Sequence, residues 1–288
     1  MATEIYTHGQ TFHIDELFAI AFIKIYVDKD IKVNRTRDSD ILKEAKKDPN
    51  KWVIDVGFEY DPSMKNFDHH QNGFQKTWAC GTPKSSCGIV WDYLKENNFL
   101  AQHMNKETIE TIEKEVIIKV DKQDNGIEMW KEAFFISIFN RQSNDNNVLD
   151  KQFHKALRST EEFFKNMFGV IRQEIKAKKE VNKVIKDSEE FEGVVVLKSN
   201  NKRLIHELQG TDQKFVVAPY RGKDEFQIRS ISNIKMPKTW GGRQGKELEE
   251  ISGFPGMIFC HKGSHLCVVK GNKELAIFIA QHIIKNEK

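Results

Sequence analysis

The chain has 288 residues, of which 39% are hydrophobic and 10% aromatic. This length and content predict a globular protein with one large domain or two of ordinary size, and they exclude global disorder. Charged residues make up 30% of the chain, yet the formal net charge is only +3. Any contact with nucleic acid should therefore be a local patch and not a global positive field.

The first half of the chain alternates strand-like runs with amphipathic runs. We expect strands at Glu4–Thr7, Ile31–Thr36 and Trp52–Val56, and helices at Asp15–Val27 and Asp38–Lys47. Strands that alternate with helices indicate βαβ units around a parallel sheet. Ligand sites on such sheets gather at the carboxyl ends of the strands, where His8 and Asp55 stand.

The middle of the chain is predicted to be helical. Three helices are expected between Ser85 and Asn140, and a longer one from Val148 to about Ile175. It continues into the charged stretch Lys176–Glu190, which is typical of an exposed connector. Beyond it, short strands and two helices predict a smaller α+β domain. The expected organisation is a metal-binding catalytic domain over residues 1–145, a connecting helix and linker over 146–190, and a substrate-binding domain over 191–288.

No segment predicts membrane insertion or targeting. No apolar run approaches the roughly 18 to 20 residues of a membrane span, and the first residues lack a signal or transit pattern. Cys80 and Cys87, like Cys260 and Cys267, are separated by six residues, which is neither a CxxC redox motif nor a usual zinc spacing. We interpret the cysteines as reduced thiols and expect a cytoplasmic or nuclear protein that does not enter a membrane.

Four segments carry acids or histidines suited to a metal ion. They are the loop T-H-G-Q-T-F-H-I-D-E with His8, His13 and Asp15; Asp55 at the end of an apolar strand; F-D-H-H-Q with Asp68, His69 and His70; and V-D-K-Q-D-N-G with Asp121 and Asp124. Each segment alone has a plain structural alternative, such as a helix cap at Asp15 or a solvated helix end at Asp121 and Asp124. Mixed imidazole and carboxylate ligands suit Mn²⁺, Fe²⁺ or Zn²⁺, and a shared carboxylate can bridge two cations about 3.5 to 4 Å apart.

These blocks, in this order, resemble the DHH phosphoesterase superfamily. Together with R-T-R-D, V-I-D-V-G-F-E-Y-D-P and K-S-S-C-G, they are similar to the melanocyte-proliferating-gene (Myg) family of that superfamily. The resemblance is strong over the first 130 residues and looser over the last 100. It implies an α/β fold with a parallel-sheet DHH-type N-terminal domain and a smaller α+β C-terminal domain.

The resemblance also implies roles for the matching positions. His8, His13 and Asp55 would hold one cation, while Asp15, Asp55, His69 and either Asp121 or Asp124 would hold a second. The histidine at position 13, where relatives often have Asp, favours Mn²⁺ over Mg²⁺. His70 would face the phosphate, and Asp68 would orient a histidine.

Substrate-binding residues are expected in both domains. Arg35 and Arg37 follow the second strand and can neutralise phosphate, although a solvated charge there is an equal alternative. W-G-G-R-Q-G-K-E-L-E-E-I-S-G resembles a family segment and supplies Gly241 and Gly242. The family's histidine is His261. Arg243 stands one place early, and the double glycine after His261 is missing, so the resemblance is weaker here.

The expected function is a metal-dependent phosphodiester hydrolase, and the family relationship implies a 3′-to-5′ exonuclease acting on single-stranded RNA or short oligonucleotides. The alternatives are a small-molecule phosphatase or pyrophosphatase and a non-catalytic metal-binding scaffold. A cleft lined by Phe58, Tyr60, Phe74 and Trp78 would favour stacked bases over pyrophosphate. Metal identity, RNA against DNA, direction of degradation and a homodimer stay open.

Overall fold

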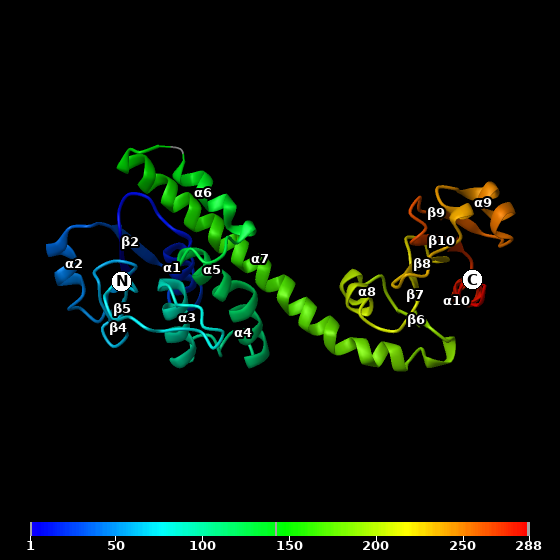
Figure 1. The fold of residues 1–288 in the computed structure, drawn as a ribbon, viewed down its shortest axis with the longest axis horizontal. Coiled ribbons are helices and arrows are strands. Elements are labelled where there is room, and N and C mark those ends of the chain that lie inside the picture. Colours follow the sequence, from blue (N-terminus) through cyan, green and yellow to red (C-terminus); the bar gives the residue numbers. More distant parts are fainter. Residues whose placement is uncertain (1, 142, 287–288) are drawn as a thin grey trace. The chain divides into compact units, whose positions relative to one another are not determined.

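The computed structural model describes residues 2–141 and 143–286. The chain forms two compact units that divide between Ile171 and Arg172, and each unit contains a five-stranded sheet (Figure 1). The first unit is α/β and the second is a smaller α+β unit, which confirms the predicted fold class. The division falls inside the segment expected to connect two domains.

The sheet of the first unit is parallel except at one edge. Its strands are β1 (Thr3–Thr7), β2 (Ile31–Arg35), β3 (Trp52–Ile54), β4 (Tyr60–Asp61) and β5 (Asn66–Phe67), in the order β2-β1-β3-β5-β4. Only β4 is antiparallel to its neighbour, and it continues the sheet beyond β5. The carboxyl ends of β2, β1, β3 and β5 therefore meet at one edge of the sheet.

The helices of the first unit pack around α1 (Ile14–Tyr26). The others are α2 (Ser39–Ala45), α3 (Ser86–Glu96), α4 (Lys106–Ile112), α5 (Ile118–Asp124) and α6 (Phe134–Asn140), with a π-helical turn at Glu113–Ile117 and a 3₁₀ turn at Lys131–Ala133. Helix α1 is apolar on all sides from Leu17 to Ile23, and each of these side chains is fully buried. A helix of this kind belongs in a core, and α1 packs against α3 and α5.

Helix α7 (Asn146–Lys186) is longer than predicted. Phe153 and Phe164 are buried in the first unit, and Phe164 packs 4.6 Å from Phe22 of α1, ring centre to ring centre. The stretch Lys176–Glu190 is helical as far as Lys186, and its apolar side chains pack against a core cluster of the second unit. The many charged residues between those apolar positions made the stretch resemble an exposed connector.

The second unit has helices on both faces of its sheet. The strands are β6 (Val194–Val196), β7 (Phe215–Pro219), β8 (Glu225–Ser230), β9 (Met257–Cys260) and β10 (Leu266–Lys270), in the order β6-β7-β8-β10-β9. One core includes side chains of α9 (Gly245–Ser252) and α10 (Lys273–Lys285), and the other includes side chains of α8 (Lys202–Leu208). Short 3₁₀ turns lie at Glu189–Phe191 and Lys238–Trp240. Helix α9 was not predicted, because its eight residues include only two large apolar side chains, Leu248 and Ile251, and Leu248 alone is buried.

Among the described residues, no helix is both long and apolar enough to span a bilayer.

Asp121 fastens α5 to the beginning of α3. Its fully buried carboxylate accepts hydrogen bonds from the Trp78 indole, from Ser85 Oγ at 2.6 Å and from the Gly88 backbone at 3.1 Å. Burial raises the pKa of Asp121 to about 7, although these three donors act in the opposite direction. A Cβ atom at Gly88 would lie 2.1 Å from Asp121 Oδ2, so the two elements approach too closely for any side chain there.

We predict that Gly88→Ala lowers the free energy of unfolding by about 2 kcal/mol or more, because the added methyl group must displace a buried, hydrogen-bonded carboxylate. Gly169→Ala is the matched control, since Gly169 lies inside α7 with open space around it. That change should raise the free energy by roughly 0.5–1 kcal/mol through helix propensity. Urea unfolding monitored by tryptophan fluorescence measures both variants, and equal effects would contradict the packing described here.

Candidate metal centre

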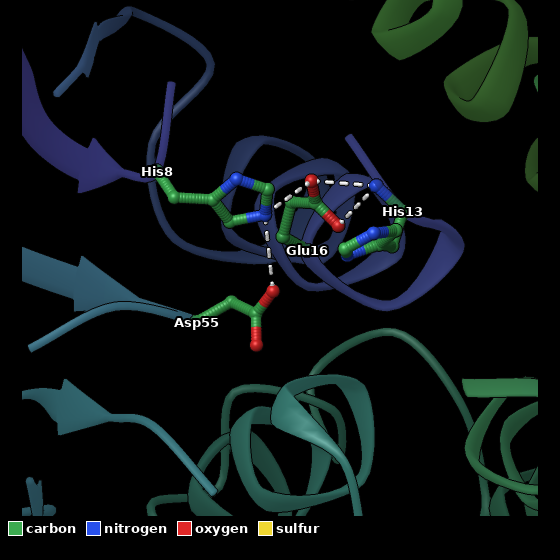
Figure 2. Close-up of side chains that lie close together, drawn as sticks. All are labelled: His8, His13, Glu16 and Asp55. Atoms are coloured by element: carbon green, nitrogen blue, oxygen red, sulfur yellow. Dashed lines mark hydrogen bonds and ion pairs between the residues drawn. The ribbon is translucent and has the colours of Figure 1, made fainter. Parts of the chain in front are cut away.

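His8 lies directly beyond β1 and is 2% exposed. Its Nε2 atom is 3.1 Å from Glu16 Oε1 and 3.3 Å from Asp55 Oδ2, between the two carboxylates (Figure 2). Burial acts to lower the pKa of His8, but the hydrogen bonds to Asp55 and Glu16 outweigh it and raise the pKa to about 10. Without a metal the ring therefore carries a proton between two acids, which is a position that a cation can take instead.

Asp55 lies directly beyond β3 and faces two groups of side chains at once. Its Oδ2 atom points at His8, whereas Oδ1 is 3.4 Å from His69 Nε2 and accepts a hydrogen bond from Ser86 Oγ at 3.0 Å. Burial would raise the pKa of Asp55, but the hydrogen bonds with His69 and His8 lower it. The backbone of Asp55 has a φ of 57°, in the left-handed region that non-glycine residues seldom occupy. Such geometry is concentrated at functional sites.

Asp15 is a fully buried acid in the first turn of α1. Apart from the carboxyl group of Asp124, no described residue forms a hydrogen bond to either of its carboxylate oxygens. Burial, together with repulsion from Asp55 and Asp124, raises the pKa of Asp15 well above its usual range. A buried carboxylate without donors is costly unless a cation neutralises it, so Asp15 fits a metal ligand better than a helix cap.

The two adjacent histidines after β5 both approach Asp55 Oδ1, at 3.4 Å from His69 Nε2 and 3.6 Å from His70 Nδ1, but they differ in exposure and in their other partners. His69 Nε2 lies 3.3 Å from Asp124 Oδ2 and 3.8 Å from Asp15 Oδ2, among the buried acids. The side chain of His70 is 49% exposed, and its Nδ1 atom is held 2.7 Å from Asp68 Oδ1. That hydrogen bond is the main cause of the raised pKa of His70.

The carboxylate of Asp68 fixes the position of the neighbouring His70. Its carboxylate accepts hydrogen bonds from the backbone of His70 at 3.1 Å and of Phe58 at 2.7 Å. Burial acts to raise the pKa of Asp68, but the hydrogen bonds from His70 and the backbone lower it. The carboxylate therefore stays charged and fixes the ring of His70.

The two acids of the V-D-K-Q-D-N-G block lie in different environments. Asp124 lies against Asp15 and His69, whereas the carboxylate of Asp121 is occupied by the three donors described above. Their spacing predicted that both lie on one face of the helix end. The structure brings Asp124 alone into the cluster.

Glu16 is a member of the cluster that the sequence did not single out. Both of its carboxylate oxygens accept the backbone N–H of His13, at 2.7 and 2.9 Å, so Glu16 closes a capping box at the beginning of α1. His13 itself is exposed, with its ring centre 5.3 Å from that of His8 (Figure 2). The signal available in the sequence was the spacing of the capping box, an acid three residues beyond the N-cap position.

The ligand atoms of these residues gather in three overlapping sets, each within 4.8 Å. The sets are His8, His13, Glu16 and Asp55; Asp55, His69 and His70; and His13, Asp15 and Asp124. Asp55 belongs to two sets and His13 to two. Buried carboxylates mixed with imidazoles form a suitable donor set for a divalent transition-metal cation, so the residues present fit metal binding.

The two arginines expected to contact phosphate differ. Arg35 is enclosed: it binds Asp150 and the backbone of Gln10, and it lies 4.6 Å above the ring of Phe153. Its side chain is 3% exposed and paired with Asp150, although Arg35 and Arg37 both line a cavity of about 290 Å³. Arg37 is exposed, and its Nη2 atom is 3.2 Å from His8 Nδ1.

In the second unit, the residues singled out lie around the end of β9. The backbone N–H of Gly242 donates to Cys260 at 3.0 Å, and a Cβ atom at Gly241 would lie 2.9 Å from the backbone oxygen of Lys262. His261 is exposed, and its ring centre is 4.2 Å from that of His265.

Three of the four aromatic residues expected to line a cleft lie beside the two adjacent histidines. Phe58 is 6.4 Å from His70 and Phe74 is 6.4 Å from His69, ring centre to ring centre, and Tyr60 packs on Phe74 at 5.6 Å. Trp78 is instead buried and donates to Asp121. The described cavity next to the cluster is lined by other aromatic residues, Phe12, Trp130 and Phe134.

The parallel sheet and the cluster at its carboxyl edge define the class of a metal-dependent phosphoesterase. The family model MYG1_exonuc, described as an uncharacterised protein family (UPF0160), matches residues 4–284. The chain belongs to this family. It is 31% identical to a MYG1 protein of Chlamydia muridarum over 91% of this chain and 90% of that protein. It is 24% identical to a human protein named MYG1 exonuclease over 88% of this chain and 79% of that protein.

Two solved structures show a weaker similarity. Thermus thermophilus RecJ in complex with Mn²⁺ matches 99% of this chain and 52% of its own, with 11% identity and a TM-score of 0.29. The pGpG-specific phosphodiesterase PggH of Vibrio cholerae matches 99% and 97%, with 14% identity and a TM-score of 0.29. At these TM-scores, neither likeness bears on the function of this chain.

We predict that Asp15→Asn weakens divalent-cation binding by at least tenfold, because it removes a buried negative charge. The same change should raise the thermal midpoint of the metal-free protein, since it relieves repulsion with Asp55 and Asp124. Asp40→Asn, at an exposed acid of α2, is the control and should change neither. Calorimetric Mn²⁺ titration and thermal unfolding after chelation measure the two effects, and unchanged Mn²⁺ affinity in Asp15→Asn would remove Asp15 from the site.

Proposed function

We propose that the chain is a 3′-to-5′ exonuclease that hydrolyses phosphodiester bonds of single-stranded RNA or short oligonucleotides, using two divalent cations, with Mn²⁺ preferred over Mg²⁺. The observation that carries the proposal is the buried acid Asp15, whose carboxyl group has no hydrogen-bond partner among the described residues except Asp124 and lies near His69. Burial and the neighbouring acids raise its pKa, and a cation at this position would stabilise the charged carboxylate. Family membership supports hydrolysis of a phosphoester.

The donor atoms support two neighbouring sites that share one ligand. His8, His13 and Asp55 would hold one cation, and Asp15, Asp55, His69 and Asp124 the other. Asp55 suits the shared position, because its two oxygens face different partners. Bound cations would lower the pKa of a water molecule and neutralise charge on the phosphate.

His70 is the residue that we assign to the reacting phosphate. The buried carboxylate of Asp68 holds its Nδ1 atom and raises its pKa, so the ring is disposed to carry a proton at neutral pH. Its side chain is half exposed, so the Nε2 atom is accessible from outside the cluster. A protonated imidazole in this position can stabilise negative charge or give its proton to the leaving oxygen.

We propose that Arg37 and residues of the second unit bind the nucleotides of the substrate that are not being cleaved. Arg37 is exposed beside His8, in keeping with a phosphate contact, whereas Arg35 is committed to Asp150. In the second unit we keep Gly241, Gly242 and His261 as candidates, since open space surrounds the Cβ position of Gly242 and His261 is exposed.

The substrate class is tested with metal-loaded protein and end-labelled RNA, end-labelled DNA and inorganic pyrophosphate in parallel. We expect RNA to be shortened one nucleotide at a time from the 3′ end, faster with Mn²⁺ than with Mg²⁺, and pyrophosphate to be left intact. Label placed at the 5′ end and at the 3′ end distinguishes the direction of degradation. Preferential hydrolysis of pyrophosphate would favour the small-molecule alternative, and tight metal binding without hydrolysis of any substrate would favour a scaffold.

We expect His69 and His70 to have different functions. His69→Ala is expected to lower metal occupancy, because it removes a nitrogen located 3.3 Å from Asp124 and 3.4 Å from Asp55. His70→Ala should retain metal and lower kcat by about 10²- to 10⁴-fold. Elemental analysis and steady-state kinetics measure the two effects, and His103→Ala, outside the cluster, is the control. Loss of metal to the same extent in both variants would refute the assignment of His70.

A further inference from the structure

A cavity of about 310 Å³ opens directly beside the metal centre. His13 and Asp124 line it and also belong to one set of candidate ligands. The remaining wall comes from the loop before α1 and from the segment Met129–Arg141, which contains α6. A group bound in this cavity would therefore lie next to whatever the cations bind.

Apolar side chains form much of the wall. Phe12 is 1% exposed and Trp130 is 6% exposed, so both are held by the surrounding packing and form a fixed inner wall of the cavity. Asn140 fixes the Phe12 backbone by accepting its N–H at 3.2 Å and donating to its carbonyl oxygen. Phe134 and Met129 stand at the rim, 51% and 76% exposed, which is unusual for such large apolar side chains. Aromatic rings and a thioether around a slot of this size favour a planar ring as ligand.

Two of the polar residues in the wall, Gln123 and Arg141, have donor groups available to a ligand. Gln123 Oε1 accepts the backbone N–H of Trp130 at 3.0 Å, which fixes the amide and leaves its NH₂ group without a hydrogen-bond partner in the described part of the chain. The guanidinium of Arg141 lies 5.3 Å above the ring of Phe134 and, within residues 2–141 and 143–286, has no carboxylate partner. Asp124 is the only acid among the described residues that line the cavity. The cavity thus offers an amide donor and a free cation beside its apolar surfaces.

We propose that this cavity binds the base of the 3′-terminal nucleotide, the one removed in each cleavage. The inference rests on the proposed exonuclease function and adds to it a site that positions the end of the substrate. The base would stack on the exposed ring of the rim residue Phe134, next to the inner wall formed by Phe12 and Trp130, with Gln123 donating to an acceptor on its edge. Arg141 would neutralise a phosphate, and Asp124 would connect the bound nucleotide to the cations. A volume of about 310 Å³ lies at the lower end of the range for ligand pockets and suits a single nucleoside.

The proposal predicts that the base, and not only the phosphate, determines the rate. Two substrates are compared in the presence of Mn²⁺. One is a short RNA whose 3′-terminal nucleotide is intact, and the other is the same RNA with an abasic 3′-terminal nucleotide. Stacking of one base on aromatic side chains should make kcat/KM about five- to hundredfold higher for the intact end. Methyl p-nitrophenyl phosphate, which has no base, reports hydrolysis independent of the cavity.

Ser137→Phe tests the location. Ser137 lies on α6 and lines the cavity, so a phenylalanine there fills the space. The preference for the intact end should fall to less than twofold, with most of the loss in kcat/KM for the intact RNA. Ile138→Phe is the matched control, because Ile138 is its neighbour on α6, is 50% exposed and does not line the cavity. It should retain the preference.

A second pair of variants tests the site without filling it. Phe134→Ala should reduce the preference, and Phe134→Tyr, which keeps an aromatic face, should restore it. Equal rates on intact and abasic ends in the unmodified protein, or a full preference in Ser137→Phe and Phe134→Ala, would overturn the base site while leaving the exonuclease function standing. Failure to hydrolyse any of the substrates, including the small diester, would overturn both.

Discussion

Parallel pairing of β1, β3 and β5 is the constraint on which the rest of the site depends. Each strand is followed at once by a functional side chain: His8, Asp55 and the Asp68-His69-His70 triplet. Because the strands run in the same direction, these residues meet at one edge of the sheet. A shift of one residue in the pairing would turn alternate side chains to the opposite face. The register of three short strands therefore decides whether a metal centre exists.

The site also concentrates negative charge where water cannot screen it. Three buried acids lie close together here: Asp15 and Glu16 in the first turn of α1, and Asp55 beyond β3. The following turns of α1 are fully buried in the hydrophobic core. The amino end of that helix favours anions only modestly, so the histidines and the proposed cations must supply most of the compensating charge. The rigid core of α1 keeps the acids from moving apart. The packing of the core therefore holds these three acids close together although their charges repel one another.

The sequence predicted the strand–helix alternation and the main ligand candidates, because both depend on local patterns. It could not choose between Asp121 and Asp124, since that choice depends on donors from Trp78 and Ser85, which are distant in sequence. Glu16 was missed as a member of the cluster, because a capping box indicates only the beginning of a helix and does not indicate that His8 and Asp55 lie next to the acid. The two-residue strands β4 and β5 are too short for any periodicity to indicate them.

The cavity beside the metal centre shows why distant contacts matter for function. Phe12 and Asn140 are 128 positions apart, yet the amide of Asn140 binds both backbone polar groups of Phe12. In the sequence Phe12 lies between His8, directly beyond β1, and Asp15, in the first turn of α1, so Asn140 at the end of α6 restrains the segment between these two proposed ligands. A base bound in the cavity that Phe12 lines would restrict the same segment and favour the geometry of the proposed ligands. By linkage, bound cations must then favour the base by the same factor. The exposed side chains of Phe134 and Met129 are consistent with this coupling. In the proposal, the substrate covers their apolar surface. Burial of this surface therefore contributes to the binding free energy only when the nucleotide is bound together with the cations.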